Sequence, residues 1–119
     1  MNGLKLNNSS ENLVRLCLRN IKKVIEAEEF KQDSVLFNSI LDVATKYALI
    51  DVVEDFYKLM KKRGLKDSSN TCTYLIQSYT QADKYQEALE IFGRMMSNGM
   101  KMKESLYGLV LEACIRNGK

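Results

Sequence analysis

Hydrophobic residues recur along this chain at intervals of three and four, the spacing that gathers them on one face of an α-helix. There is no proline, and no stretch sustains the alternation of apolar and polar residues that is typical of a strand. The pattern predicts about six helices, over residues 11–29, 35–47, 51–63, 70–82, 86–98 and 105–117. Gly64 and Gly99 follow two of these segments and can supply the left-handed residue that ends a helix. The chain is therefore expected to be all-α.

The pattern also repeats, without a gap, after 35 residues, so that block 34–68 overlays block 69–103. Five positions are identical, in the pairs Ser34 and Ser69, Thr45 and Thr80, Met60 and Met95, Gly64 and Gly99, Lys66 and Lys101. A period of this length marks a solenoid, in which each helix pair buries its apolar face only against its neighbours. The function of such an array belongs to a surface repeated along it, and not to one catalytic pocket.

The period divides the chain into five segments. Residues 1–10 are expected to be a flexible N-terminal tail, and residues 11–33 the second helix of a preceding or capping repeat. Blocks 34–68 and 69–103 are the first and second repeats, and 104–119 is the first helix of a truncated third. Both ends would expose faces meant for neighbouring helices. This favours a piece of a longer array over a small protein that dimerises through its ends.

Composition narrows the possible functions. The 119 residues carry a net charge of +3, which is too small to argue for nucleic acid by itself, and they include no histidine. Without the commonest general base and metal ligand, we expect no catalytic centre, metal, cofactor or small-molecule substrate. No apolar run approaches the ~20 residues that span a bilayer, so no membrane partner is expected, and no targeting segment is visible.

The three cysteines, Cys17, Cys72 and Cys114, form no paired motif and fall on apolar helical positions. This placement predicts reduced, buried thiols rather than a disulfide framework or a zinc site.

Each block resembles the pentatricopeptide repeat. In the first block the likeness is carried by Phe37, Asn38, Ile40, Leu41, Phe56, Tyr57, Met60, Gly64, Leu65 and Lys66. In the second it is carried by Leu75, Ile76, Ala88, Leu89, Phe92, Met95, Gly99, Met100 and Lys101. Asp67 and Met102 stand where that repeat usually has proline, and Cys72–Thr73 where it has Tyr–Asn. The resemblance implies a right-handed superhelix of antiparallel helix hairpins that binds single-stranded RNA.

The tetratricopeptide repeat is the nearest alternative, because it is also a helix pair and uses a protein-binding groove. Its tryptophan is absent here, and Gly3 is the only glycine before Gly64, so its first-helix glycine is absent as well. The spacing of 35 between Gly64 and Gly99 also favours the pentatricopeptide repeat over a 34-residue period.

By this resemblance, each repeat reads one RNA base through its fifth and last residues, and its second residue stacks on the base. In the first block these are Asn38, Ser68 and Val35. An Asn amide offers two donors and an acceptor to a base edge, and Val35 is an apolar wedge. By the resemblance, Asn at the fifth position combined with Ser at the last indicates a pyrimidine, with cytosine favoured. This block is therefore a credible reader of an RNA base.

The corresponding residues of the second block are Thr73, Lys103 and Asn70. They make a weaker set, because a Lys side chain can donate but not accept, and Asn is a poor stacking wedge. In the third block Ser105 and Gly108 offer almost no reading group.

Lys46, Gln81 and Arg116 share one register late in the first helices. The resemblance often places a phosphate-contacting lysine there, so Lys46 and Arg116 are candidate RNA phosphate ligands. The alternative is that basic groups near a helix C-terminus simply favour the helix dipole.

Three functions remain open. The leading hypothesis is a single-stranded RNA-binding module involved in RNA processing, stability or translation. The second is a protein-interaction solenoid, in a scaffold or on a ribosome, with protein partners at the exposed ends. The third is the RNA-positioning part of a larger enzyme whose catalytic domain lies outside this chain. The resemblance implies a mitochondrion or plastid, with the cytoplasm as an alternative.

Overall fold

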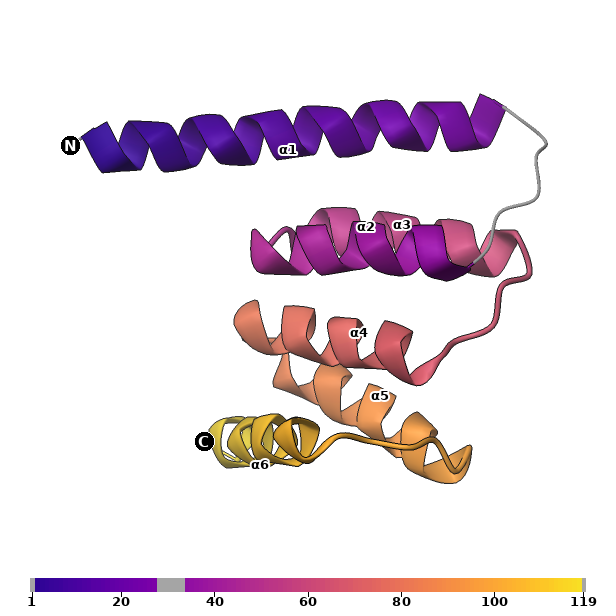
Figure 1. Ribbon diagram of the computed structural model, residues 1–119. Coiled ribbons are helices and arrows are strands. Elements are labelled where there is room, and N and C mark those ends of the chain that lie inside the picture. The colour runs from indigo at the N-terminus through magenta and orange to yellow at the C-terminus, as the bar shows by residue number, and fades with distance from the viewer. Residues whose placement is uncertain (1, 28–33, 119) are drawn as a thin grey trace.

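The computed structural model describes residues 2–27 and 34–118, and these residues form six α-helices and no strand (Figure 1). The helices are α1 (Asn2–Ala27), α2 (Ser34–Lys46), α3 (Ile50–Lys62), α4 (Ser69–Gln81), α5 (Tyr85–Ser97) and α6 (Glu104–Asn117). Each helix from α2 to α6 begins and ends within one residue of a predicted segment. The expected all-α fold is confirmed.

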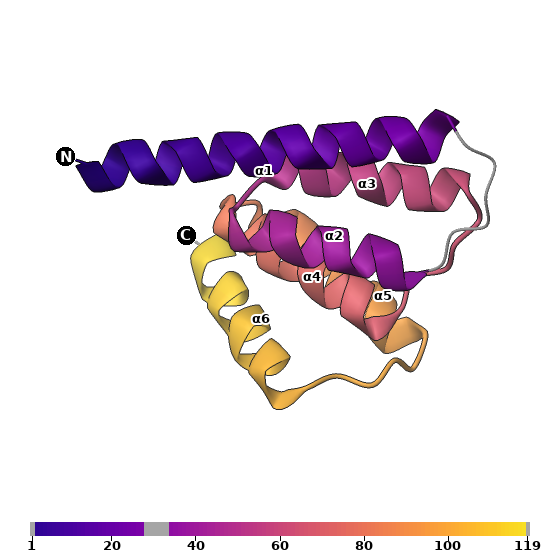
Figure 2. The ribbon, with the colours of Figure 1, turned by 45° about the horizontal axis from the view of Figure 1, so that its top comes forward.

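The helices stack as hairpins along the molecule. Helix α2 packs against α3 and α4 against α5, while α2 also contacts α4 and α4 contacts α6. The first helix of each hairpin therefore lies beside the next first helix, and Figures 1 and 2 show this order running from α1 to α6. Helix α1 lies along α3, as the second helix of a preceding pair would.

The core follows the sequence period. Leu41 and Ile76 occupy the same position of α2 and α4, and Met60 and Met95 the same position of α3 and α5; all four are fully buried. In the first hairpin, the rings of Phe37 and Phe56 meet edge to face with centroids 6.3 Å apart. Such a pair favours a fixed rotation of the two helices about their axes.

Helices α2, α3, α4 and α5 all end in the same Schellman geometry, and in α3 and α5 the left-handed residue is glycine. The Gly64 N–H donates to Lys61 O and the Leu65 N–H to Met60 O, both at 3.0 Å. Gly99 and Met100 repeat these bonds one period later. Both glycines have positive φ, 77° and 64°, as predicted for helix terminators.

The two turns inside the hairpins also use a left-handed residue, but it is not glycine. Ala48 has φ 56° and Asp83 has φ 61°. The Leu49 N–H donates to Ala44 O and the Lys84 N–H to Tyr79 O, which closes the same motif. The backbone geometry therefore repeats although the residue at the turn changes.

The predicted tail over residues 1–10 is wrong, because α1 begins at Asn2 and continues through this segment. The helix extends past residue 11 towards the N-terminus because no proline intervenes and extending an existing helix adds one hydrogen bond per residue. Residues 28–33 lie outside the described part of the chain. The end of the predicted second-helix segment, 11–33, therefore lies outside it as well.

Only one side of α1 is buried. Leu18 and Ile25 lie in the core beside α3, whereas Leu13 and Leu16 are 63% and 50% exposed. The spacing of the apolar residues predicted that they would gather on one face of this helix. Instead α1 has two apolar stripes, and within the described residues only one of them meets a neighbour.

The prediction of three buried thiols is correct for Cys72 and wrong for Cys17 and Cys114, which are exposed. Cys17 lies on the uncovered stripe of α1. Cys114 lies on α6, where no second helix within the described residues covers it.

Polar contacts also join α1 to the array. The Arg15 guanidinium donates to both oxygens of Asp51, at 2.8 and 3.2 Å, and this lowers the pKa of the Asp51 carboxyl. Near the other end of α1, Arg63 Nη2 donates to Ile25 O at 2.7 Å. These contacts fix the direction of α1 along α3.

Candidate nucleic-acid interface

The predicted reading residues lie on, or directly before, the first helices of the hairpins. Asn38 lies on α2, and Ser68 immediately precedes α4. Ser68 is the N-cap of that helix, because its Oγ accepts the Thr71 N–H at 3.1 Å. The packing of α2 on α4 brings the fifth residue of the first block to the last residue of the same block.

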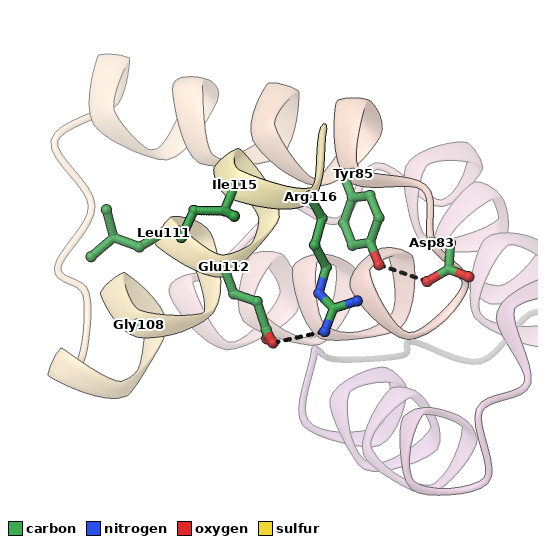
Figure 3. A pocket seen from close by; sticks show the side chains of 7 residues that line it. All are labelled: Asp83, Tyr85, Gly108, Leu111, Glu112, Ile115 and Arg116. Carbon is green, nitrogen blue, oxygen red and sulfur yellow. Dashed lines mark hydrogen bonds and ion pairs between the residues drawn. The ribbon is translucent and has the colours of Figure 1, made fainter. Parts of the chain in front are cut away.

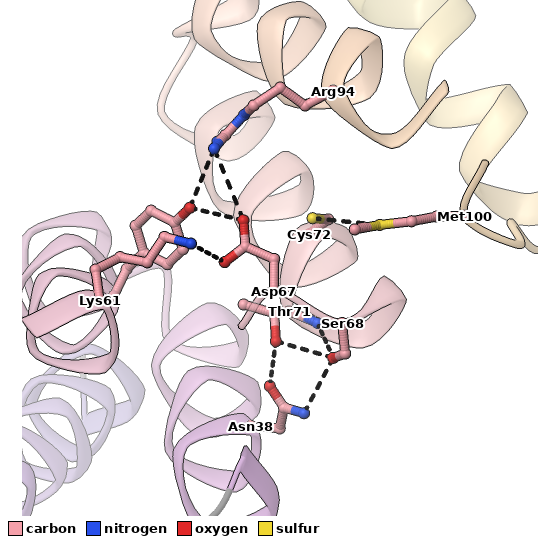
Figure 4. Close-up of polar contacts among 9 residues, drawn as sticks. Asn38, Lys61, Asp67, Ser68, Thr71, Cys72, Arg94 and Met100 are labelled. Atoms are coloured by element: carbon pink, nitrogen blue, oxygen red, sulfur yellow. Dashed lines mark hydrogen bonds and ion pairs between the residues drawn. The ribbon is translucent and has the colours of Figure 1, made fainter. Parts of the chain in front are cut away.

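The structure places Asn38, Ser68 and Thr71 in one polar cluster (Figure 4). Asn38 Nδ2 donates to Ser68 Oγ at 3.5 Å, and Asn38 Oδ1 accepts the Thr71 hydroxyl at 2.8 Å. Ser68 Oγ and Thr71 Oγ1 are 2.9 Å apart. The sequence predicted the Asn38–Ser68 pair but not its third member.

Thr71 could have been noticed from the register alone. Its equivalents one period earlier and later are Leu36 and Leu106. A hydroxyl at a position that is otherwise leucine is a signal of a buried hydrogen bond.

Val35 lies one turn before Asn38 on α2 and is 69% exposed. An apolar side chain this exposed is free to contact a flat apolar surface such as a base. The first block therefore presents an apolar wedge, Val35, on the same helix as Asn38, and the polar pair joins Asn38 of α2 to Ser68 at the N-terminus of α4.

The second block does not assemble a matching pair. The Thr73 hydroxyl donates to Ser69 O in its own helix at 2.8 Å. Asn70 and Lys103 are exposed, and among the described residues no hydrogen bond joins Thr73 to Lys103. In the third block Ser105 and Gly108 are exposed.

Each candidate phosphate ligand is paired with an acid one turn earlier. Lys46 Nζ lies 3.2 Å from Asp42 Oδ2, and Arg116 Nη2 lies 3.4 Å from Glu112 Oε1. Because all four side chains are at least one-third exposed, these pairs are weak and can open to a competing anion. The cations stay accessible, but the local charge is close to neutral.

Lys46 and Gln81 line one shallow hollow between the first helices, together with Asp42, Gln77, Leu109 and Glu112. Arg116 lines a neighbouring hollow on α6, shown in Figure 3. There the Tyr85 hydroxyl donates to Asp83 Oδ1 at 2.6 Å, and this bond raises the pKa of Tyr85. The three residues of the predicted register thus lie along the array but not in one site.

A second polar cluster, which the sequence did not indicate, surrounds Asp67 in the link between the two blocks (Figure 4). The Tyr57 hydroxyl donates to Asp67 Oδ2 at 2.9 Å, and Lys61 Nζ lies 3.1 Å from Oδ1. Arg94, from α5, donates to the Tyr57 hydroxyl at 3.3 Å. Burial raises the pKa of Tyr57, and the hydrogen bond to Tyr57 raises that of Arg94. This cluster ties α3, the link and α5 together.

Two classes of site receive no support from the described residues. They contain no group of three or more His, Cys, Asp or Glu side chains placed to hold a metal ion. They also contain no helix that is long and apolar enough to cross a membrane.

Helical hairpins stacked through their first helices define a repeat protein of the α-solenoid class. A family profile described as pentatricopeptide repeat-containing protein matches residues 34–118. The chain therefore belongs to the pentatricopeptide repeat family, as the sequence pattern predicted.

Two curated proteins are similar to this chain. A mitochondrial pentatricopeptide repeat-containing protein of Arabidopsis thaliana is 29% identical over 98 residues, which cover 82% of this chain and 20% of that protein. Pentatricopeptide repeat-containing protein 1 of Mus musculus, also mitochondrial, is 26% identical over 95 residues, covering 78% of this chain and 14% of that protein. The chain thus spans a fifth or less of the length of these relatives.

Proposed function

We propose that this chain is a single-stranded RNA-binding module of a pentatricopeptide repeat protein, in which the first block reads one base, a pyrimidine, and the second contributes little sequence preference. The observation that supports this most is the pairing of Asn38 with Ser68 at 3.5 Å, beside the exposed Val35. These are the polar pair and the apolar wedge that base reading by one repeat requires.

The module has no catalytic role in this proposal and serves RNA processing, stability or translation. Both curated relatives are mitochondrial proteins, which supports a mitochondrial location for this one. A catalytic domain elsewhere in a longer parent protein is compatible with the same role.

A protein-interaction solenoid is the second candidate. It is favoured by the second block, where Thr73 is bonded to its own helix, and by the acids that neutralise Lys46 and Arg116. In that case the uncovered apolar stripe of α1 and the exposed Leu111 and Ile115 of α6 would contact the protein partner.

The two candidates are separated by comparing Asn38→Ala with Lys46→Ala. RNA binding is measured by NMR titration with short RNAs that differ in base composition, at two salt concentrations. We expect Asn38→Ala to reduce the preference for pyrimidine by roughly three- to tenfold, the worth of one hydrogen bond. Lys46→Ala should weaken all RNAs alike and lower the salt slope by about one phosphate contact.

Equal, sequence-independent losses for the two variants would contradict base reading and leave only a weak basic groove. No RNA binding by the unchanged chain, even at low salt, would favour the protein-interaction solenoid.

A further inference from the structure

We infer that Thr71 is a positioning residue for base reading: through a closed ring of hydrogen bonds with Ser68, it holds the Asn38 side chain in place for contact with the RNA base. The inference rests on the proposed function, because Asn38 must contact a base for its orientation to matter. It adds a residue of the second block to the reader of the first.

The position of Thr71 is the first reason. Its side chain is fully buried, where the equivalent residues of the other blocks are Leu36 and Leu106. Burying a hydroxyl without a partner is unfavourable, whereas a leucine there carries no such cost. The cost of burying the Thr71 hydroxyl is offset by its hydrogen bonds to Asn38 and Ser68, at 2.8 and 2.9 Å.

With the Asn38 amide placed as the structure has it, the count of hydrogens gives the direction of the ring. Asn38 Oδ1 carries no hydrogen, so the Thr71 hydroxyl must donate to it. The single hydroxyl hydrogen of Thr71 is then already in use, so the Ser68 hydroxyl donates to Thr71 Oγ1. Ser68 Oγ in turn accepts from Asn38 Nδ2 and from the Thr71 N–H. The ring is closed, and every hydroxyl hydrogen in it is used.

The consequence is a defined donor. The Ser68 hydroxyl has no hydrogen left for a base, and one Nδ2 hydrogen of Asn38 remains uncommitted. That hydrogen matches the O2 acceptor that both pyrimidines carry. Without the Thr71 hydroxyl, the Asn38 side chain would keep only its longer bond to Ser68 Oγ and would be held less firmly at the base, which would weaken the preference.

The second block shows what happens where the ring cannot form. The residue equivalent to Thr71 in the next block is Leu106, which has no hydroxyl. The reading residue Thr73 bonds instead to Ser69 O of its own helix.

The inference is tested by NMR on the 15N-labelled chain with the variants Thr71→Val, Thr71→Ser and Thr45→Val. Valine has the shape of threonine without its hydroxyl, and serine keeps the hydroxyl. Thr45→Val is the matched control, because the Thr45 hydroxyl is buried and has no hydrogen-bond partner among the described residues. Without RNA, Thr71→Val should shift the side-chain amide signals of Asn38, while Thr45→Val should leave them in place.

The second measurement is the ratio of dissociation constants for short adenine and short pyrimidine RNAs. We expect Thr71→Val to reduce this ratio roughly three- to tenfold, the worth of one hydrogen bond, and Thr71→Ser to retain it. An unchanged ratio in a Thr71→Val chain that still binds RNA would overturn the role of Thr71 and leave the proposed function standing. Absence of any RNA-dependent shift in the unchanged chain would overturn both.

Discussion

At the scale of single residues, side chains make the two blocks different although their backbones repeat. Asn38 is held by a residue of the next block, whereas Thr73, at the same register, bonds to its own helix. The two readers differ at three equivalent positions: Asn38 against Thr73, Ser68 against Lys103, and the buried Thr71 against the buried Leu106. In the proposed function, base reading by the first block therefore depends on a residue of the next block as well as on Asn38 and Ser68.

The thiols give a residue-scale prediction. Alkylation of the folded chain at about pH 8 should modify the exposed Cys17 and Cys114 and spare Cys72. Burial raises the pKa of the Cys72 thiol to about 11, so this thiol also stays protonated under these conditions. Mass spectrometry should find two labels on the native chain and a third only in denaturant. Fast labelling of Cys72 without denaturant would contradict the packing of α4.

The same thiol makes stability depend on alkaline pH. Its pKa in the folded chain lies above the ordinary value of 9.0, so the unfolded chain loses this proton first. The contribution of Cys72 to stability is therefore present below pH 9 and is lost as the pH rises from about 9 to about 11. Cys72→Ala should flatten this part of the denaturation profile.

At the scale of helices, the repeated Schellman ends position each element against the next. Gly99 ends α5 with φ 64°, and a Cβ added there would meet nothing within 4 Å. The cost of a side chain at this position is therefore purely one of backbone conformation.

Gly99→Ala should lower the free energy of unfolding by about 1 kcal/mol, because alanine is disfavoured in the left-handed region. Gly93→Ala is the matched control, since Gly93 lies inside α5 and its added Cβ also meets nothing. This variant should raise the free energy of unfolding by roughly 0.5–1 kcal/mol, the helix preference for alanine over glycine. Urea denaturation measures both, and equal signs would contradict the assigned geometry.

Asp67 stabilises the packing between helices, because its carboxylate joins α3 to α5 across the link that precedes α4. Asp67→Ala should lower the free energy of unfolding by about 1–3 kcal/mol, since it leaves the half-buried Tyr57 hydroxyl without its acceptor. Asp42→Ala removes only an exposed ion pair with Lys46 and should change stability by less than about 0.5 kcal/mol. Thermal or urea denaturation of the two variants would show no difference if the Asp67 cluster were merely solvated.

At the scale of the whole molecule, the sequence was sufficient for the helices and their order. The gapless period and the terminators Gly64 and Gly99 fix the hairpins, because each turn closes the same backbone motif. Burial at the two ends was harder to predict. Cys17 and Cys114 have core-like spacing but no covering helix within the described residues, and spacing alone does not reveal which apolar stripe finds a neighbour.

The candidate site could be predicted from the sequence only in part, because some of its contacts depend on how the helices pack. The positions of Asn38 and Ser68 follow from the register, but their bond to Thr71 joins three side chains from two blocks. The Asp67 cluster likewise depends on how α5 packs beside α3. Contacts of this kind arise from tertiary packing and leave little trace in the local pattern.

The size of the array limits its affinity. Two complete repeats can engage about two bases, and a stacked base is worth roughly 1–3 kcal/mol, while association costs about 4 kcal/mol or more. We therefore expect this chain alone to bind RNA weakly, with dissociation constants well above the micromolar range.

The most direct test of the account is an NMR titration of the 15N-labelled chain with short pyrimidine RNA at low salt. We predict weak binding, with shifts concentrated on α2 and the start of α4, at Val35, Asn38 and Ser68. The outer helices α3 and α5 should change little. Shifts confined to α3 and α5, or nanomolar affinity, would contradict base reading by the first block.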